Sequence, residues 1–168
     1  MLREFVAGDR AALARIASDP AVLKQVPPDS RALAAAARAG AGARPGRARR
    51  AYHLAIVVRR SGKLIGACDL TLVRPREADV GYLLARRHWG YGYGAEVAKI
   101  LVEQSFTSLG LRRISAVVAI DNDRSRRVLE KAGLHWQGLM RRHARAAGRW
   151  RDCHLYVLAR ADWQARSA

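Results

Sequence analysis

One short stretch near the middle of the chain constrains the fold and the chemistry more than any other. Residues 79–96 read DVGYLLARRHWGYGYGAE: an apolar, β-favouring run, a basic and aromatic segment, and then Gly90, Gly92 and Gly94 directly before a helix-like pattern. Glycine adopts positive φ and lets the backbone approach a ligand closely. Alternating glycines at a helix start can aim several free N–H groups at one point, with the helix dipole behind them. The stretch therefore predicts a strand–loop–helix unit with a cradle for an anion such as a phosphate.

Two other phosphate-binding loops fit this stretch less well. A Walker loop ends in Gly-Lys followed by Ser or Thr, whereas Gly94 is followed by Ala95 and Glu96. A dinucleotide-binding fingerprint needs an early βαβ unit with an acidic residue about 20 positions further on. Here the glycines lie past the middle of a short chain. The glycines alone also fit a strand-to-helix turn that binds nothing, so their neighbours must decide.

Length and composition predict one globular domain spanning residues 1–168. Half of the residues are hydrophobic, which is enough for a continuous core, so disorder is not expected. No apolar run approaches the roughly 18 residues of a membrane span, and the first residues, MLREFVAGDR, lack the apolar centre of a signal peptide. Cys68 and Cys153 form no motif, which favours free thiols and a cytoplasmic location.

The chain carries a formal net charge of +17. Only four of its 31 basic residues are lysines, so 27 are arginines, and this bias fits a GC-rich genome as well as selection for an acidic partner. A field of this sign attracts phosphates, acidic proteins or nucleic acids. Nucleic acid is not expected as the main substrate, because no basic stripe is interleaved with stacking aromatic residues and no RNA-binding motif occurs.

Hydrophobic periodicity predicts alternating strands and helices. Breaks are expected at Asp19-Pro20 and Val26-Pro27-Pro28, because proline cannot continue a helix. The strands are expected at Leu2–Val6, His53–Arg59, Leu64–Val73, Ala78–Leu84, Arg113–Ile120, Leu134–Met140 and Trp150–Ala159, and the helices at Ala11–Ser18, Arg31–Ala39, from the glycines to about Leu109, and Arg124–Ala132. This order predicts an α/β (α+β) fold, with a mixed, mostly antiparallel sheet of six to seven strands and about four helices.

Two segments resemble one superfamily. Arg87-x-x-Gly90-x-Gly92 resembles the pyrophosphate loop of the GNAT N-acetyltransferases. Residues 121–134, DNDRSRRVLEKAGL, resemble the N-x-x-S-x-x-V-L-E-K-x-G-F segment of members akin to the ribosomal-protein N-terminal acetyltransferases. The resemblance extends to the opening of the chain and to the last expected hairpin. Leu134 stands where this group usually has Phe, and Gly94 where Ala is more common, which should loosen the helix start slightly.

The resemblance implies the GNAT acyltransferase fold, acetyl-CoA as co-substrate and no metal. On their own, Asn122 and Ser125 are typical helix-cap residues. The resemblance implies that Asn122 bonds the pantetheine or the helix backbone, and that Ser125 places a hydroxyl near the thioester sulfur and acts in catalysis. The cofactor-binding residues implied are Leu83, Leu84, Arg87, Trp89, Gly90, Tyr91, Gly92, Tyr93, Gly94, Asn122 and Ser125. The five histidines show no i,i+4 pair and no cysteine at ligand spacing, so the residues also predict no metal site.

Acetyl transfer to an amine by direct attack needs a neutral amine, because the ammonium form cannot attack. A carboxylate could remove the proton directly or through water. Asp79 is the first candidate, since related enzymes often carry Glu on the corresponding strand. Asp69, Glu77 and His88 are further candidates. An α-amine needs little help, so the enzyme could also work without a dedicated base.

The acceptor, partners and assembly stay open at this point. A protein N-terminus, such as that of an acidic protein, is the first acceptor expected from the resemblance. A small amine such as an aminoglycoside, a polyamine or an amino-acid derivative is the alternative. A non-catalytic CoA-binding or basic nucleic-acid-associated module is the alternative from another class. Residues 40–50, GAGARPGRARR, are expected to be a solvated loop or a basic flap beside the acceptor. A monomer or homodimer is expected, and Trp136, Trp150 and Trp163 are expected to pack in the core, with a dimer surface as the alternative.

Overall fold

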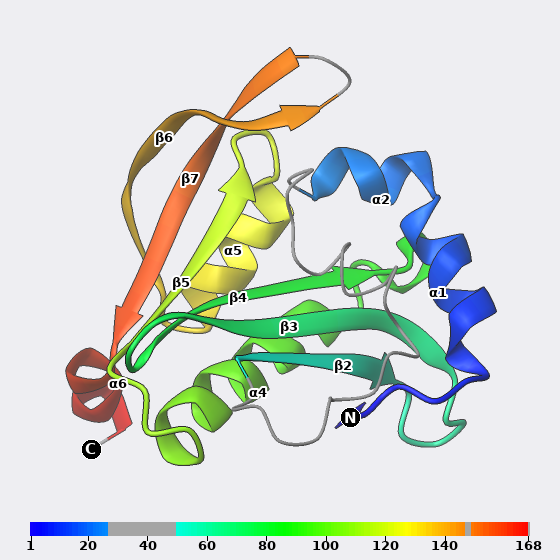
Figure 1. Cartoon of the computed structure of the whole chain (residues 1–168), viewed down its shortest axis with the longest axis horizontal. Coiled ribbons are helices and arrows are strands. Elements are labelled where there is room, and N and C mark those ends of the chain that lie inside the picture. Colours follow the sequence, from blue (N-terminus) through cyan, green and yellow to red (C-terminus); the bar gives the residue numbers. More distant parts are fainter. Residues whose placement is uncertain (27–49, 147–148, 168) are drawn as a thin grey trace.

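A single seven-stranded sheet forms the centre of the molecule (Figure 1). The computed structural model describes residues 1–26, 50–146 and 149–167. The strands follow one another across the sheet in the order β1-β2-β3-β4-β5-β7-β6. Every neighbouring pair is antiparallel except β4 and β5, which run parallel. The strands are β1 (Leu2–Arg3), β2 (Ala51–Val57), β3 (Leu64–Arg74), β4 (Glu77–Leu84), β5 (Arg113–Ala119), β6 (His135–Ala146) and β7 (Arg149–Ala159).

The parallel pair separates soon after it begins. β4 and β5 are in register only from Glu77 opposite Arg113 to Asp79 opposite Ser115. β4 nevertheless continues to Leu84, and β5 remains paired with β7 as far as Ala119. The two strands diverge visibly from this point in Figure 1. The carboxyl-terminal half of β4 is therefore not paired with β5, and its backbone edge faces the space between the strands.

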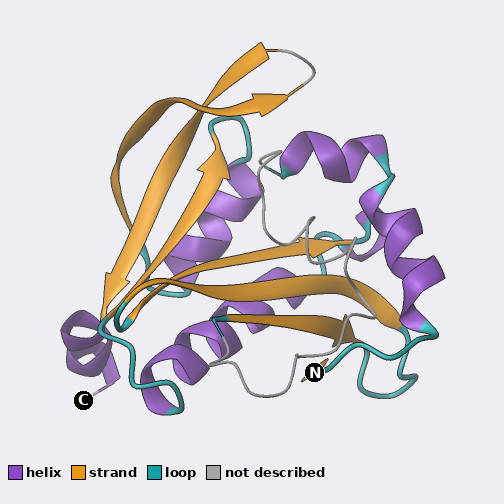
Figure 2. Cartoon of the chain, in the orientation of Figure 1, coloured by secondary structure: helices purple, strands orange, loops and turns teal. Residues whose placement is uncertain are grey.

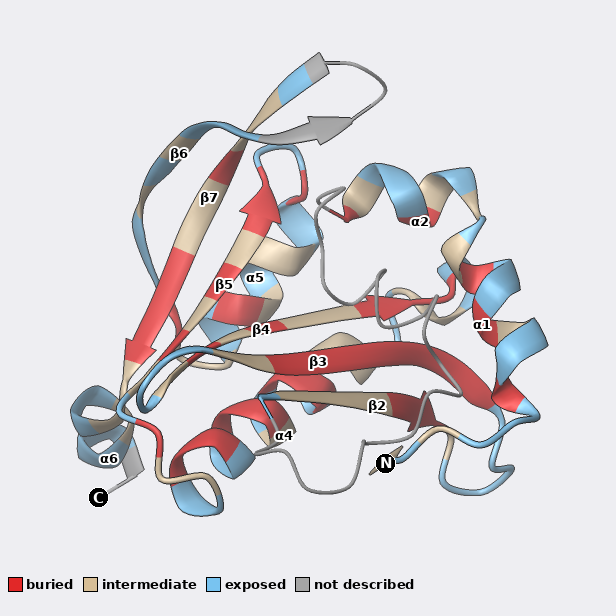
Figure 3. Cartoon of the chain, viewed as in Figure 1, coloured by how far each residue is buried: buried red, intermediate tan, exposed pale blue. Residues whose placement is uncertain are grey.

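Helices cover both faces of the sheet (Figure 2). Among the described residues, two α-helices and a one-turn 3-10 helix precede Gly90 in the sequence, and three α-helices follow it. The helices are α1 (Asp9–Ala17), α2 (Pro20–Gln25), the 3-10 helix η1 (Arg86–His88), α4 (Tyr93–Thr107), α5 (Asp123–Lys131) and α6 (Arg160–Ser167). Most of β3, one face of α4 and the end of β7 are buried in the interior (Figure 3).

Two hydrophobic clusters hold the layers together. The larger one packs α4, through side chains such as Leu101 and Phe106, and α5 against the sheet. The smaller one packs Leu13 of α1 and Val22 of α2 against the opposite face, where Leu83 of β4 is buried. Alternate residues of β4 contribute to the two clusters because successive side chains of a strand point to opposite faces.

The structure confirms the predicted fold class, with one mixed sheet and helices on both faces. The predicted end of the central helix is also confirmed, since Gly110 lies just beyond α4 with φ +59°. The first strand is shorter than predicted, and α2 and α6 were not predicted. The expected helix at 31–39, the loop at 40–50 and the turn of the last expected hairpin, at 146–148, fall wholly or mostly outside the described residues.

Proline explains why α2 escaped prediction. Asp19-Pro20 does end α1, but it also begins the next helix, because the Asp19 carboxylate accepts a hydrogen bond from Ala21 N–H at 2.8 Å and Pro20 occupies the first helical turn.

The tryptophans divide between two environments. Trp163 packs on Phe106 of the core, whereas Trp136 and Trp150 are 56% and 51% exposed, so their expected core packing was wrong.

Candidate active site

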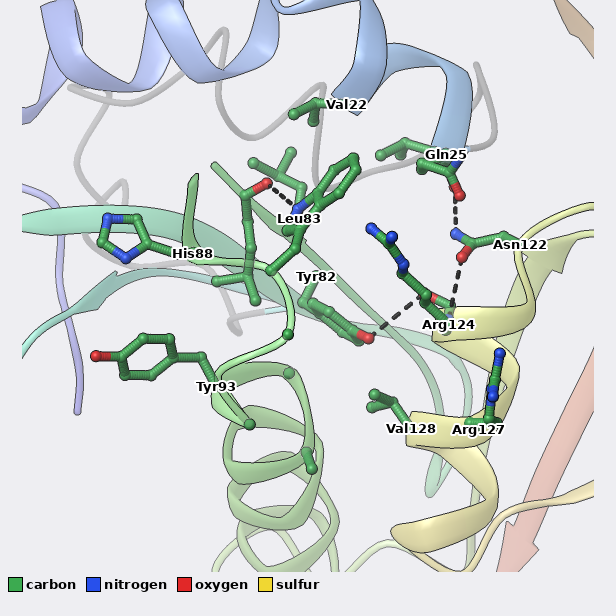
Figure 4. A pocket seen from close by; sticks show the side chains of 18 of the residues that line it. Val22, Gln25, Tyr82, Leu83, His88, Tyr93, Asn122, Arg124, Arg127 and Val128 are labelled. Carbon is green, nitrogen blue, oxygen red and sulfur yellow. Dashed lines mark hydrogen bonds between the residues drawn. The ribbon is translucent and has the colours of Figure 1, made fainter. Parts of the chain in front are cut away.

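A cleft of about 450 Å³ lies where β4 separates from β5 (Figure 4). The end of β4 and the loop into α4 form one wall, α5 forms the other, and α2 contributes two residues together with Val26 at its end. The lining residues are Val22, Gln25, Val26, Tyr82, Leu83, Leu84, His88, Trp89, Gly90, Gly92, Tyr93, Gly94, Ala95, Asn122, Arg124, Ser125, Arg127, Val128 and Lys131. Segments far apart in the sequence therefore meet at the gap in the sheet.

The glycine loop has the backbone conformation of an anion cradle. Gly90 and Gly92 have φ of +85° and +83°, and Gly92 is the left-handed residue from which α4 begins. Helix geometry leaves the first N–H groups of α4 without intrahelical acceptors, and the first such bond recorded here runs from Glu96 N–H to the Gly92 carbonyl. A side chain at either glycine would be strained by its φ. The loop thus offers backbone donors and the positive end of a 15-residue helix to one point.

Trp89 fixes the loop against the strand that precedes it. Its indole N–H donates to the Leu84 carbonyl at 2.8 Å, and the Arg124 guanidinium lies 5.4 Å from the centre of its ring. Trp89 therefore joins the loop to both walls of the cleft. His88 accepts a hydrogen bond from the Arg87 guanidinium at 3.2 Å. Burial lowers the pKa of His88, and the charges of Arg87 and Lys63 lower it further, which favours the neutral imidazole.

Two hydroxyl groups meet across the inner part of the cleft. Tyr82 Oη of β4 lies 3.4 Å from Ser125 Oγ of α5, and burial raises the pKa of Tyr82, so the phenol is neutral near pH 7. Gly94 makes room for this arrangement. A Cβ at Gly94 would lie 3.2 Å from Tyr82 Oη and 3.4 Å from Val128 Cγ2. The first turn of α4, the end of β4 and α5 therefore touch at one place.

Asn122 connects the α5 wall of the cleft to the end of α2. Its Oδ1 accepts the Ser125 N–H at 3.0 Å and caps α5, while its Nδ2 donates to the Gln25 carbonyl at 2.8 Å. Arg151 of β7 makes a parallel connection, because it donates to the Lys24 carbonyl and pairs with Asp121 at 2.7 Å. The end of α2 is thus held over the cleft by donors from two other elements. Asn122 is 6% exposed, so these bonds are shielded from water.

The cleft gathers most of the residues that the sequence singled out. Its lining includes Leu83, Leu84, Trp89, Gly90, Gly92, Tyr93, Gly94, Asn122 and Ser125. Arg87 and Tyr91 lie outside the lining. Arg87 lines a separate hollow beside α1 with Arg15 and Arg86, and Tyr91 is 75% exposed.

Of the candidate bases, His88 lines the cleft, whereas the carboxylates Asp69, Glu77 and Asp79 lie on the sheet outside its lining. The Asp79 carboxylate accepts a hydrogen bond from Ser115 Oγ at 2.6 Å. Asp79 lies four residues before Leu83, and four residues of extended strand span about 13 Å. Asp69 of β3 is paired with Gly81 of β4 and is buried. Its Oδ1 would lie 2.9 Å from a Cβ at Gly81, so this glycine leaves space for the carboxylate. Asp69 and Asp79 occupy the same face of neighbouring strands.

Sequence reasoning missed several lining residues. Tyr82 lies within the quoted stretch, and its alternation with Leu84 could have placed it on the same face. On α5, Arg124, Arg127 and Lys131 recur at i, i+3 and i+7, which marks one face of a helix. Val22, Gln25 and Val26 had no local signal, because α2 itself was not predicted.

The lining is basic. Among the described residues that line the cleft, three carry a positive charge and none is a carboxylate. Within the described part of the chain, no group of His, Cys, Asp and Glu side chains could hold a metal ion. The described helices include none with the length and apolar character needed to cross a membrane.

Comparison with known sequences identifies the family. The model of the acetyltransferase (GNAT) domain matches residues 1–135. An uncharacterised N-acetyltransferase, p20 of Bacillus licheniformis, is 32% identical over 115 residues, which are 67% of this chain and 65% of that protein. The putative ribosomal N-acetyltransferase YdaF of Bacillus subtilis is 29% identical over 89 residues, covering 53% of this chain and 49% of YdaF. The chain therefore matches less than two thirds of the length of these relatives.

Solved structures share the same arrangement of strands and helices. A GNAT-family acetyltransferase from Bacillus anthracis superposes with a TM-score of 0.79 at 20% identity, covering 95% of this chain and 94% of that one. The spermidine N-acetyltransferase of Vibrio cholerae, in complex with CoA and spermine, superposes with a TM-score of 0.77 at 18% identity. The match covers 98% of this chain and 97% of that one. With a seven-stranded sheet that opens between β4 and β5, a glycine loop at that opening and a family model spanning most of its length, the chain belongs to the GNAT acetyltransferase family.

Proposed function

We propose that this protein transfers the acetyl group of acetyl-CoA to a primary amine, and that a protein N-terminal α-amine is the acceptor. The observation that carries the first part is the glycine cradle at the start of α4, which opens into the cleft between β4 and α5. Its backbone N–H groups suit a diphosphate, and a side chain at Gly90 or Gly92 would be strained in this backbone conformation. Acetyl-CoA supplies an acetyl group activated as a thioester.

In this proposal each wall of the cleft has its own task. The loop from Trp89 to Gly94 holds the phosphates, and the free edge of β4 at Leu83 and Leu84 offers backbone groups to the extended pantetheine. Holding both reactants together supplies several kcal/mol of the barrier. Ser125 is the proposed hydroxyl beside the sulfur, and its partner Tyr82 is neutral and able to donate to it. No covalent enzyme intermediate is needed, because the amine attacks directly.

Asp79 remains the first proposed base, with Asp69 as its alternative. Both carboxylates lie on the same face of the sheet, and Asp69 is the nearer to Leu83, which lines the cleft. A base is needed only for the amine molecules that are protonated. An α-amine has a pKa near 8, so part of it is already neutral near neutral pH. Asp79→Asn is expected to lower kcat strongly with little change in CoA affinity, and Asp69→Asn is the matched comparison. Near-wild-type turnover of Asp79→Asn would remove Asp79 from this role.

Two features bear on the acceptor. The relative YdaF is named a putative ribosomal N-acetyltransferase, which supports a protein N-terminus. The spermidine N-acetyltransferase of Vibrio cholerae supports a polyamine as second candidate, and the adjacent carboxylates Asp69 and Asp79 would favour a cation there. The net charge of +17 opposes a polycation and favours an acidic protein.

The test is a panel of acceptors with release of free CoA thiol as the readout. Peptides that differ only in their first residue, the same peptides blocked at the α-amine, spermidine and an aminoglycoside are compared. Turnover of the free peptides and not of the blocked ones supports the proposal, whereas selective turnover of spermidine supports the second candidate. Binding of CoA without thiol release across the panel would contradict an enzymatic function. A cytoplasmic location is part of the proposal, because Cys68 and Cys153 are free thiols.

A further inference from the structure

One face of α5 presents its positive charges to the cleft. Arg124, Arg127 and Lys131 all line it, and we refer to these three residues as the α5 basic stripe. Their spacing places them on one side of the helix, along about 10 Å of its length. Figure 4 shows Arg124 extending from α5 into the cleft, with Arg127 one turn further along the helix beside Val128.

The stripe lies opposite the glycine loop. Val128, between Arg127 and Lys131, is the side chain whose Cγ2 would lie 3.4 Å from a Cβ at Gly94. The first turn of α4 and the middle of α5 are therefore in contact. The loop contributes backbone donors and a partial charge from the helix dipole, but no formal charge. The formal charges on this part of the cleft come from the opposite wall.

Positive charge near the start of α5 is unfavourable for the helix itself. Arg124 lies in the first turn of α5, after the cap Asn122, where the positive end of the helix dipole disfavours a cation. Arg127 follows only one turn later. The carboxylates next to the stripe are already engaged. Asp123 pairs with Arg126 at 2.9 Å, Asp121 pairs with Arg151 at 2.7 Å, and Glu130 accepts a hydrogen bond from Tyr156 Oη at 3.0 Å. The position of Arg124 destabilises α5, and no carboxylate among the described lining residues offsets this. This combination indicates that the positive charges bind an external anion.

We propose that the α5 basic stripe is a second phosphate-binding wall, which acts together with the glycine loop to recognise the phosphorylated part of the acetyl donor. This proposal rests on the proposed function. The stripe's outer members, Arg127 and Lys131, contact phosphate oxygens of the bound donor. Arg124, which lies over the Trp89 ring, links the stripe to the loop. The ligand chemistry is a phosphate, either the diphosphate or the 3′-phosphate of CoA.

The experiment measures binding and not turnover. Dissociation constants for CoA, 3′-dephospho-CoA and adenosine 3′,5′-bisphosphate are obtained by calorimetry for the full chain, with melting temperatures as a check on folding. The test variant is Arg127→Gln/Lys131→Gln. The matched control is Arg126→Gln, which removes the same kind of charge from the same helix but from a residue that does not line the cleft. A general attraction by the arginine-rich surface would affect control and test variants alike.

The double variant is expected to weaken CoA binding by about tenfold or more, because a hydrogen bond to a charged group contributes roughly 1.5–3 kcal/mol. Arg126→Gln should stay within about twofold of wild type. An equal loss for CoA and 3′-dephospho-CoA assigns the stripe to the diphosphate, and a loss confined to CoA and the bisphosphate assigns it to the 3′-phosphate. Unchanged CoA binding in the double variant, or an equal loss in the control, overturns the proposal. Absence of CoA binding by the wild type would instead overturn the proposed function.

Discussion

Replacing Asn122 tests whether one side chain both caps α5 and holds α2 over the cleft. Its Oδ1 accepts from Ser125 N–H at 3.0 Å, and its Nδ2 donates to the Gln25 carbonyl at 2.8 Å. Asn122→Ala removes both bonds. Asn122→Asp keeps an oxygen that caps the helix, since Asp caps as well as Asn, but replaces the donor to Gln25 with a carboxylate oxygen. The two variants therefore separate the cap from the connection to α2.

The structure sets the size of the expected effects. Loss of the cap costs about 1 kcal/mol. Loss of a shielded hydrogen bond costs about 1 kcal/mol, and a carbonyl left without its partner brings this to as much as about 3 kcal/mol. The free energy of unfolding should fall by about 2–4 kcal/mol in Asn122→Ala and by about 1–3 kcal/mol in Asn122→Asp. At about 2–4 °C for each kcal/mol, the alanine variant should melt roughly 5–15 °C below wild type.

Chemical denaturation, followed by circular dichroism, measures both free energies, and calorimetry measures CoA affinity for the same samples. Because α2 contributes Val22 and Gln25 to the cleft and Val26 follows at its end, Asn122→Asp should also weaken CoA binding although the cap is kept. An aspartate variant as stable as wild type, with unchanged CoA affinity, would show that the bond to Gln25 does not position α2. The reasoning about the end of α2 would then be refuted, while the cap of α5 would stand.

Three further predictions use other contacts. Gly94→Ala should weaken CoA binding in the wild type, whereas in a Tyr82→Phe background the same change should stabilise the protein, because the phenyl ring lacks the Oη that would lie 3.2 Å from the new Cβ. A double-mutant cycle measures this coupling between the two residues, and equal effects of Gly94→Ala in both backgrounds would contradict it. The hydrogen bond from Arg3 lowers the pKa of Asp9, so the stability that this pair contributes is present above the unfolded pKa of about 4 and is lost as pH falls through the folded pKa. Denaturation curves of Asp9→Asn should therefore show a shallower loss of stability below about pH 4 than wild type, and identical profiles would count against the pair. Burial raises the pKa of Cys68 to about 12, so in a Cys153→Ser background this thiol should resist a disulfide reagent near neutral pH until the protein is unfolded, and rapid labelling of the native protein would be inconsistent with its burial.

The parts of the site that could be predicted are those written in local sequence. Alternating glycines before a helix determine their own backbone conformation, and Gly92 does take the left-handed conformation from which α4 begins. Asn122 caps the helix that follows it, as its residue type indicates. Each of these features depends on a few neighbouring residues, so a single sequence is enough to show them.

The parts that could not be predicted depend on residues far apart in the chain. The opening between β4 and β5 exists because β5 pairs with β7 beyond the point where it leaves β4, and no local pattern encodes that register. The position of α2 depends on Asn122 and on Arg151, which lie about a hundred or more residues away from it. Asp79 had the expected residue type and strand, yet its hydroxyl partner Ser115 belongs to another strand, so its environment was not visible in the sequence.

Gly94 shows how such a distant contact can explain a local departure from a family pattern. From the sequence, glycine in place of the commoner alanine predicted only a slightly looser helix start. In the structure the absence of a methyl group at Gly94 spares Tyr82 Oη, which lies beside Ser125, a tight contact of 3.2 Å. Alanine would favour the helix by about 1 kcal/mol. The glycine is therefore best understood together with Tyr82, since a methyl group at the start of α4 would make a tight contact of 3.2 Å with the phenol oxygen at the end of β4.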